Sequence, residues 1–244
     1  MLELSNVTKN FGGLCVLKRV SFTLGEGEFV GLIGPNGSGK TTLFNIIAGS
    51  LHPDGGKVTF YGRDITGFPP NKICRLGIAR TFQIPRPIKT MSVVENVMLG
   101  IFFGQKNSAG ASRSSREVKQ EAFEYLNLTG LQVDEWTMPH ELTAAALRRL
   151  ELARALATKP QLLLVDEFMS GLNALEVLEA SAILKRIRGE KKITIIWIEH
   201  VMESLMNLVE RVIVLNYGEL IAEGKPAEIS KDKRVIEVYL GEDL

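Results

Sequence analysis

The sequence predicts an α/β fold built on a mostly parallel β-sheet. Short apolar segments with strand character recur along its 244 residues, and helical stretches separate them. These segments are residues 29–33, 162–165, 193–198 and 212–215. Strands that alternate with helices favour a parallel sheet. The length fits one compact domain or two closely joined subdomains.

The first third of the chain predicts several strands and one helix. Apolar residues alternate at Leu2, Leu4, Val7 and again at Val20, Phe22, Leu24. A turn leads into the buried strand at residues 29–33, a loop over 34–39, and a helix that Gly49 is well placed to end. Residues 57–60 and Ile65 flank Tyr61-Gly62, a turn pair, so we expect a β-hairpin there.

The remainder of the chain predicts helices, then strands again. Residues 91–157 are mostly helical in pattern, interrupted by a loop over residues 108–115 that is rich in Ser, Gly and Ala. Strand character returns in the last three apolar segments, which helical stretches separate. Residues 225–244 carry mixed charges and an apolar stripe of Val235, Ile236 and Tyr239, which predicts a packed terminal helix.

Composition and charge exclude several classes of protein. Apolar residues make up 45% of the chain and charged residues 23%, as in soluble globular proteins. A net charge of +1 gives no electrostatic argument for nucleic acid as a partner. The N-terminus lacks the apolar region of a secretory signal, and no apolar stretch approaches the roughly 18 residues of a spanning helix. Cys15 and Cys74 lack metal-ligand spacing and suggest buried thiols in a reducing cytoplasm.

Residues 34–41 form a phosphate-binding motif. They read Gly-Pro-Asn-Gly-Ser-Gly-Lys-Thr and match G-x-x-x-x-G-K-[ST] in full, between a buried strand and a helix. The glycines let several backbone N–H groups face one anion, and the helix adds the positive end of its dipole. Lys40 would reach the β- and γ-phosphates of a nucleotide, and the Thr41 hydroxyl would ligate Mg²⁺. A turn that binds nothing is the alternative, and Lys40 and Thr41 together argue against it. The candidate phosphate-binding residues are Gly34, Pro35, Asn36, Gly37, Ser38, Gly39, Lys40, Thr41 and Thr42.

A second strand ends in two carboxylates. Residues 162–167 read Leu-Leu-Leu-Val-Asp-Glu. An Asp in this place holds Mg²⁺, often through water, and a second carboxylate can polarise the attacking water as a general base. Successive side chains of an extended chain point to opposite sides, so Asp166 and Glu167 can take these two roles. Acidic residues at strand ends are often merely solvated, and the phosphate motif is what strengthens the functional interpretation.

With these motifs in place, the chain resembles the ATP-binding subunits of ABC transporters over almost its whole length. By that resemblance Gln83, in Arg-Thr-Phe-Gln at 80–83, is the Q-loop glutamine, which ligates Mg²⁺ and relays to the membrane partner. Phe11 resembles the aromatic residue that stacks on adenine, although core packing explains it nearly as well. His200 resembles the switch histidine that contacts the γ-phosphate. Without their neighbours, Gln83 and His200 would be unremarkable polar residues.

The chain is more specifically similar to the ATPases of branched-chain amino acid importers. The matching segments are residues 11–14, 31–44, 62–67, 77–83, 198–200 and 238–241. The ATPases of urea importers and of lipopolysaccharide exporters share much of this pattern, including the tail, and remain alternatives. Exporters more usually read Leu-Pro-Gln where this chain reads Thr81-Phe82-Gln83. The solute itself is chosen by the permease and its binding protein, not by the ATPase.

The chain departs from the family at the signature segment. Leu-Ser-Gly-Gly-Gln is expected before the helix at residues 147–157, and residues 142–146 read Leu-Thr-Ala-Ala-Ala instead. In the family, this segment of one subunit presses on the γ-phosphate held by the other. Thr143 keeps a hydroxyl and can cap the helix, whereas the alanines favour winding into it. The candidate residues that act on the partner's site are Thr143, Ala144, Ala145 and Ala146.

The resemblance implies a RecA-like P-loop core with an antiparallel β subdomain and a helical subdomain. One ABC ATP-binding domain would span residues 1–244, with 1–83 and 158–244 forming the core and β subdomain, and 84–157 the helical subdomain. Two subunits would sandwich two ATP molecules with Mg²⁺. We expect catalytic roles for Glu167, His200 and Gln83, and metal ligation by Thr41, Gln83 and Asp166.

The resemblance also implies partners and a location. The chain would lie in the cytoplasm, peripheral at the inner face of the cell membrane through integral-membrane permease subunits. Arg113, Arg116 and Lys119 favour a solvated loop over contact with lipid or permease. A homodimer would place the altered signature in both sites, so we expect a second ATP-binding subunit that is a different chain.

Two other functional classes remain open. Non-transport ABC ATPases of DNA repair or translation usually carry two cassettes or a coiled-coil insertion, and neither is visible in this sequence. A subunit that binds ATP without useful hydrolysis is the other class, and Glu167 and His200 argue against it.

Overall fold

A computed structural model describes residues 1–104, 114–200 and 202–240. The chain divides into two compact units, one formed by Met1–Ile73 with Thr194–Leu244 and the other by Cys74–Ile193. The predicted boundaries at residues 83/84 and 157/158 stay a prediction. Residues 108–113 of the predicted loop, including Arg113, and Gly241 of the tail segment lie outside the described residues.

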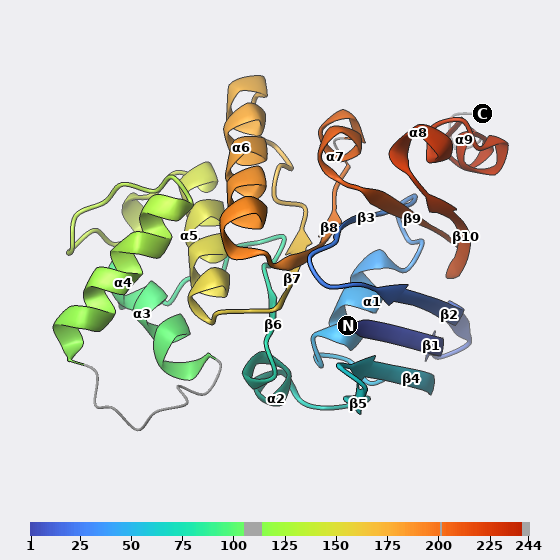
Figure 1. Ribbon diagram of the computed structural model, residues 1–244, viewed down its shortest axis with the longest axis horizontal. Coiled ribbons are helices and arrows are strands. Elements are labelled where there is room, and N and C mark those ends of the chain that lie inside the picture. Colours follow the sequence, from blue (N-terminus) through green and yellow to red (C-terminus); the bar gives the residue numbers. More distant parts are fainter. Residues whose placement is uncertain (105–113, 201, 241–244) are drawn as a thin grey trace. The chain divides into compact units, whose positions relative to one another are not determined.

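The first unit contains an antiparallel sheet of strands β1 (Leu2–Phe11), β2 (Leu14–Leu24), β4 (Gly55–Phe60) and β5 (Arg63–Asp64), in the order β2-β1-β4-β5 (Figure 1). Alternation places Leu2 and Leu4 inside, and a register shift between Leu4 and Val7 brings Val7 to the same side; each is at most 2% exposed. Tyr61 and Gly62 connect β4 to β5 with φ angles of 50° and 73°, the backbone of a tight two-residue hairpin turn. The predicted hairpin and β subdomain are therefore confirmed.

The same unit contains parallel strands. Strand β3 (Phe29–Ile33) pairs in parallel with β8 (Thr194–Ile198) and with β9 (Arg211–Asn216), and β9 pairs antiparallel with β10 (Glu219–Gly224). Every residue of β3 and β8 is buried, which explains their continuous apolar sequences. Gly31 lets helix α7 (Met202–Leu208) approach closely, because a Cβ there would lie 2.6 Å from Leu205 Cδ2.

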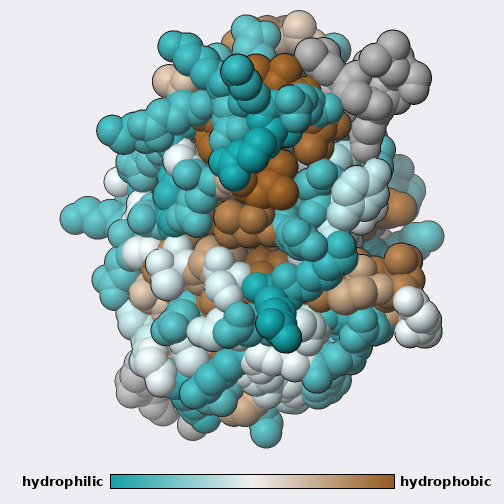
Figure 2. Space-filling model, turned by 90° about the vertical axis from the view of Figure 1, so that its right-hand side faces the viewer, coloured by the Kyte–Doolittle hydropathy of each residue, from teal (hydrophilic) through white to brown (hydrophobic). Residues whose placement is uncertain are grey.

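Short helices complete the first unit. They are α1 (Lys40–Ile47), α8 (Pro226–Ile229) and α9 (Lys233–Leu240), and α2 (Pro70–Arg75) carries the chain into the second unit. Figure 2 shows one face of the molecule, with hydrophobic side chains gathered in its middle and hydrophilic ones around them. A groove in this unit is lined by residues of β9, β10 and α9, among them Leu220, Ile221 and Val238. Val235 is buried, which fits the predicted packed terminal helix.

The second unit joins two parallel strands to a helical bundle. Strand β6 (Ile78–Arg80) pairs in parallel with β7 (Leu162–Asp166). Its helices are α3 (Val93–Phe103), α4 (Ser115–Leu128), η1 (Pro139–Glu141), α5 (Ala144–Ala157) and α6 (Ala174–Lys191). Helices α3, α4 and α5 pack against one another (Figure 1). The predicted helical middle of the chain is confirmed within the described residues.

The structure also tests the predictions about the two cysteines and about membrane-spanning helices. Cys15 is exposed on β2, so the prediction of two buried thiols is wrong for it: it lies at the start of the strand, where the neighbouring Leu14 is exposed as well. Cys74 is partly buried, and that burial raises the pKa of its thiol. Across the described ranges, no helix is both long and apolar enough to cross a membrane.

Candidate functional site

The phosphate loop connects β3 to α1 in the first unit. Gly34 has a φ of 147°, and a Cβ at this position would lie 2.0 Å from the Leu215 carbonyl oxygen. Gly39 has a φ of 106°, and a Cβ there would lie 2.9 Å from the Val16 carbonyl oxygen. Both glycines are therefore required for the backbone of β9 and β2 to approach the loop.

Lys40 folds back over this loop. Its Nζ donates hydrogen bonds to the carbonyl oxygens of Gly34 (2.6 Å) and Pro35 (2.8 Å), and the residue is 7% exposed. Ser38 is buried nearby, and its hydroxyl has no hydrogen-bond partner in the described part of the chain. A buried cation and an unsatisfied hydroxyl at the start of a helix fit a phosphate group, since the first helical N–H groups also lack intrahelical acceptors.

The other predicted phosphate-binding positions surround this loop. Asn36, Gly37 and Thr41 are exposed, and Thr42 is partly exposed. Thr41 belongs to the first turn of α1, so its hydroxyl lies on the same helix end as Lys40. The prediction of a strand, a glycine-rich loop and a helix in this order is confirmed by the geometry.

Phe11 ends β1 and is 49% exposed, which disfavours core packing as its explanation. Lys9 Nζ lies over its ring, 5.6 Å from the centroid. Lys9 also pairs with Asp54 at 2.7 Å, and Asp54 accepts a bond from the Asn10 backbone N–H at 2.6 Å. The bond from Lys9 holds the pKa of Asp54 below its usual range, and the Asn10 N–H acts in the same direction. These contacts brace the strand end that carries Phe11.

Asp166 ends β7 in the second unit and is 3% exposed. It forms an ion pair with Arg80, with 2.7 Å between Nη2 and Oδ2. Arg80 pairs with Leu164 in the parallel register, so its side chain shares a face with Asp166, two residues further on. The Asp166 N–H donates to Thr81 Oγ1 at 3.1 Å, which fixes the strand end to the segment after β6.

Glu167 and Gln83 meet beyond the ends of these strands. Gln83 Nε2 donates to Glu167 Oε2 at 2.6 Å. Glu167 has a φ of 46°, so the chain leaves the extended conformation there and the expected alternation with Asp166 does not apply. The two carboxylates nonetheless have different partners, one an arginine and the other an amide.

His200 follows β8 in the first unit and is exposed. Its backbone N–H donates to Glu199 Oε1 at 3.0 Å, and Glu199 is 2% exposed. The buried carboxylate therefore fixes the backbone at the point where His200 leaves the strand.

Thr143 is the N-cap of α5. Its hydroxyl accepts a hydrogen bond from the Ala146 N–H at 3.2 Å, as the capping prediction requires. Ala144, Ala145 and Ala146 form the first turn of the helix. The alanine segment is thus wound into α5, as its helix propensity predicts.

The predicted site residues fall into two groups. Phe11, the phosphate loop and His200 belong to the first unit; Gln83, Asp166, Glu167 and the Thr143 segment belong to the second. Among the described residues, no cluster of three or more His, Cys, Asp or Glu side chains could hold a metal ion by itself. Sequence reasoning missed Arg80 as the partner of Asp166, and it also missed the Lys9–Asp54 pair beside Phe11. The position of Arg80 at the end of a strand parallel to β7 was the available signal for the first.

Comparison with protein-family models gives two matches. The model described as ABC transporter matches residues 17–170, well over half of the chain. A model described as branched-chain amino acid ATP-binding cassette transporter matches residues 219–244.

Curated relatives match the whole chain. The high-affinity branched-chain amino acid transport ATP-binding protein LivG of Salmonella typhimurium is 37% identical, over 99% of this chain and 98% of its own length. BraF of Pseudomonas aeruginosa, described in the same words, is 36% identical with the same coverage.

Solved structures agree with this assignment. The ADP conformation of MJ1267, an ATP-binding cassette of an ABC transporter, superposes with a TM-score of 0.87 at 32% identity, covering 99% of this chain and 98% of that one. The dimeric bacterial ABC transporter cassette MJ0796 gives a TM-score of 0.83 at 29% identity, covering 93% and 99%. The chain therefore belongs to the ABC transporter family, as an ATP-binding subunit similar to the branched-chain amino acid transport ATP-binding proteins.

Proposed function

We propose that this chain binds and hydrolyses ATP to power the import of branched-chain amino acids through a membrane permease. The observation that carries the proposal is the phosphate loop, in which buried Lys40 and the unsatisfied Ser38 hydroxyl adjoin the start of α1. Lys40 exchanges its two carbonyl contacts for the β- and γ-phosphates, which are stronger acceptors because they are charged. The exposed ring of Phe11 stacks on the adenine.

The remaining site residues act in metal binding and in hydrolysis. Thr41, Gln83 and Asp166 would hold Mg²⁺, which would neutralise negative charge at the phosphates. Glu167 accepts a proton from the attacking water, and the Gln83 amide holds its carboxylate in place. His200 contacts the γ-phosphate. Glu199 supports this role by fixing the backbone N–H of His200.

The partners follow from this function. Integral-membrane permease subunits hold the chain at the cytoplasmic face of the cell membrane, and a second ATP-binding subunit completes each nucleotide site. We also propose the subdomain boundaries predicted from the sequence, with residues 84–157 as the helical subdomain. The curated relatives named above support branched-chain amino acids as the transported solutes.

Uptake by whole cells tests the proposal. Deleting the gene in its own host should abolish high-affinity uptake of radiolabelled leucine and leave urea uptake unchanged. Wild-type chain should restore leucine uptake, and Lys40→Ala should not, because it removes the cation that meets the phosphates. Loss of urea uptake with normal leucine uptake would overturn the assignment of the solute. Full restoration by Lys40→Ala would overturn the role of ATP.

A further inference from the structure

The segment between β6 and α3 carries Gln83, and side chains from two helices hold its irregular backbone. Asn96 of α3 forms hydrogen bonds with both backbone polar groups of Ile88. Its Oδ1 accepts from the Ile88 N–H at 2.8 Å, and its Nδ2 donates to the Ile88 carbonyl oxygen at 3.0 Å. Asn96 is fully buried. A buried amide that satisfies both polar groups of one residue fixes that residue in place.

Glu151 and Arg154 of α5 hold the backbone two residues earlier, at Arg86, and we call this pair of side chains the clamp. Arg154 Nη1 donates to the Arg86 carbonyl oxygen at 2.8 Å, and Glu151 Oε2 accepts from the Arg86 N–H over a longer 3.4 Å. The same Arg154 nitrogen donates to Glu151 Oε2 at 3.2 Å. The two α5 side chains together thus engage both backbone groups of Arg86, just as Asn96 does for Ile88.

Burying the carboxylate of Glu151 costs free energy, so packing alone does not explain a glutamate at this position. It is 6% exposed, and burial raises the pKa of its carboxyl while Arg154 acts in the opposite direction. Charged groups are seldom buried without a partner, and this one has Arg154 and the Arg86 N–H. The phosphate loop and the acidic strand end make no use of this pair.

The clamp connects to Gln83 through aromatic contacts. The Arg86 guanidinium lies over the Phe82 ring at 5.8 Å, and the Arg80 guanidinium lies over the same ring at 5.3 Å. Arg80 is the partner of Asp166, and Phe82 precedes Gln83 directly. A continuous set of contacts therefore runs from α5 through Arg86 and Phe82 to Gln83 and the end of β7.

We propose that Glu151 and Arg154 are positioning residues, which tie helix α5 to the Gln83 segment and thereby hold the Gln83 amide against Glu167. The catalytic consequence rests on the proposed function. The structural consequence, which is the restraint of residues 82–88, does not rest on the proposed function. Thr143 is also the N-cap of helix α5, so the clamp makes the candidate signature segment and the Gln83 segment parts of one connected structure.

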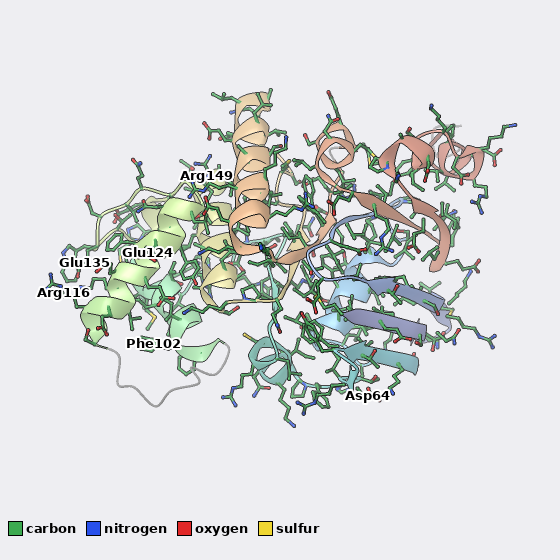
Figure 3. The ribbon with its side chains drawn as sticks, in the orientation of Figure 1. Asp64, Phe102, Arg116, Glu124, Glu135 and Arg149 are labelled. Atoms are coloured by element: carbon green, nitrogen blue, oxygen red, sulfur yellow. The ribbon has the colours of Figure 1, made fainter. Side chains whose placement is uncertain are left out.

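Hydrogen–deuterium exchange of the full chain tests the restraint without nucleotide. In residues 84–88 the exchanging amides are those of Ile84, Arg86 and Ile88, because positions 85 and 87 are prolines. Arg154→Met should speed exchange at these amides by about tenfold, because the segment loses its bond at the Arg86 carbonyl and Glu151 is left buried without its cation. Arg154→Lys keeps one donor and should give an intermediate rate. Arg149→Met is the matched control: Arg149 lies on the same helix (Figure 3) and bonds Gly130 and Glu179. It should leave exchange at residues 84–88 unchanged.

Kinetics of the assembled transporter provide the second readout. Arg154→Met and Glu151→Gln should each lower kcat by about three- to tenfold with an unchanged KM for ATP, because the phosphate loop is intact. Arg154→Lys should recover part of the loss. Their double mutant should be no worse than Arg154→Met, since the two side chains act as one clamp.

The outcomes separate the two proposals. Wild-type exchange rates at residues 84–88 in both Arg154→Met and Glu151→Gln would overturn the clamp, whatever the ATPase results. Faster exchange with an unchanged kcat would overturn its role in positioning Gln83. A failure of the proposed function would show itself elsewhere, as normal ATP turnover in Lys40→Ala and Glu167→Gln. Where Arg154→Met fails to fold, Glu151→Gln and Arg154→Lys carry the test.

Discussion

The Gln83 amide donates to the Glu167 carboxylate across 2.6 Å, joining the segment after β6 to the residue after β7. Glu167 adopts a left-handed backbone with a φ of 46°, which costs a non-glycine residue roughly 1–2 kcal/mol. Such a conformation persists only where the surrounding structure fixes it, and it is common at functional sites. The amide contact supplies part of that fixation and also sets the direction of the carboxylate.

Glu167→Gln should preserve ATP binding and slow hydrolysis. The amide has nearly the same shape as the carboxylate and stays within reach of Gln83, but it accepts no proton from water. We expect kcat to fall by about 10² or more in the assembled transporter, with a longer-lived ATP-bound state. Single-turnover measurements with radiolabelled ATP check this. An unchanged kcat would remove Glu167 from the role of general base.

Gly34→Ala and Gly37→Ala should differ sharply, although both glycines have positive φ. A Cβ at Gly34 would meet the Leu215 carbonyl oxygen at 2.0 Å, whereas a Cβ at Gly37 would meet open space. We expect Gly34→Ala to destabilise the chain by about 1–3 kcal/mol and to abolish measurable ATP binding. Gly37→Ala should cost about 1 kcal/mol and retain binding. Thermal unfolding and calorimetry with Mg²⁺-ATP measure both, and equal behaviour of the two variants would contradict the packing argument.

Asp54→Asn should weaken recognition of adenine without affecting the triphosphate. It loses the ion pair with Lys9, which holds a cation over the Phe11 ring. We expect the affinity for ATP to fall by about three- to tenfold, a loss of the size expected when one aromatic contact is weakened. The affinity for inorganic tripolyphosphate should stay constant, because it has no adenine. Phe11→Ala is the positive control. A parallel loss of both affinities in Asp54→Asn would indicate a general defect of the fold.

The same variant has a defined pH dependence. The Lys9 bond lowers the folded pKa of Asp54, so its stabilising contribution is fully present above the pKa of an unfolded Asp, about 3.9. The contribution is lost as the pH falls through the lower folded pKa. The difference in Tm between wild type and Asp54→Asn should therefore be constant near neutral pH and shrink in strong acid.

The sequence predicts those site features that depend on local order along the chain. The phosphate loop, the Asp166-Glu167 strand end and the Thr143 cap each occupy one short segment, so periodicity and motif chemistry suffice to find them. Arg80 with Asp166, Lys9 with Asp54, and Arg154 with Arg86 join segments that are far apart in sequence. Those pairs depend on strand register and helix packing, which the pattern of one segment does not specify. The backbone turn at Glu167 was missed for a related reason, because alternation assumes that a strand continues.

Glu151→Gln should change how stability depends on pH. Burial raises the folded pKa of Glu151 above the value of an unfolded Glu, about 4.3. The folded state therefore binds the proton more tightly, and stability is greatest below the unfolded pKa and declines as the pH rises through the folded pKa. The charged groups beside this carboxyl are Arg154 and Arg86. Relative to Glu151→Gln, wild type should lose Tm as the pH rises above the unfolded pKa and through the raised folded pKa, and a parallel pair of Tm curves would refute the assignment.

The altered signature segment should make ATP hydrolysis by this chain depend on its partner subunit. In the structure, Thr143 caps α5, and Ala144, Ala145 and Ala146 form its first turn. A homodimer would present this segment to both nucleotide sites, although each site would hold intact Lys40, Glu167 and His200. A heterodimer would complete this chain's own site with the signature of its partner. We therefore expect the purified chain alone to hydrolyse ATP slowly and a different ATP-binding subunit to restore the rate.

Combining Thr143→Ser, Ala145→Gly and Ala146→Gln should speed hydrolysis by the chain alone. Serine keeps the cap, glycine removes a Cβ from the surface that faces the partner's phosphate, and glutamine restores hydrogen-bonding groups. Glycine in the first helical turn costs at most about 1 kcal/mol, so the triple variant should remain folded, which thermal unfolding checks. Steady-state ATPase is measured before and after the change, and then with the partner subunit. Full activity of the unmodified homodimer would refute the asymmetry, because the cap of Thr143 and the helix start at Ala144 would then suffice to position the γ-phosphate.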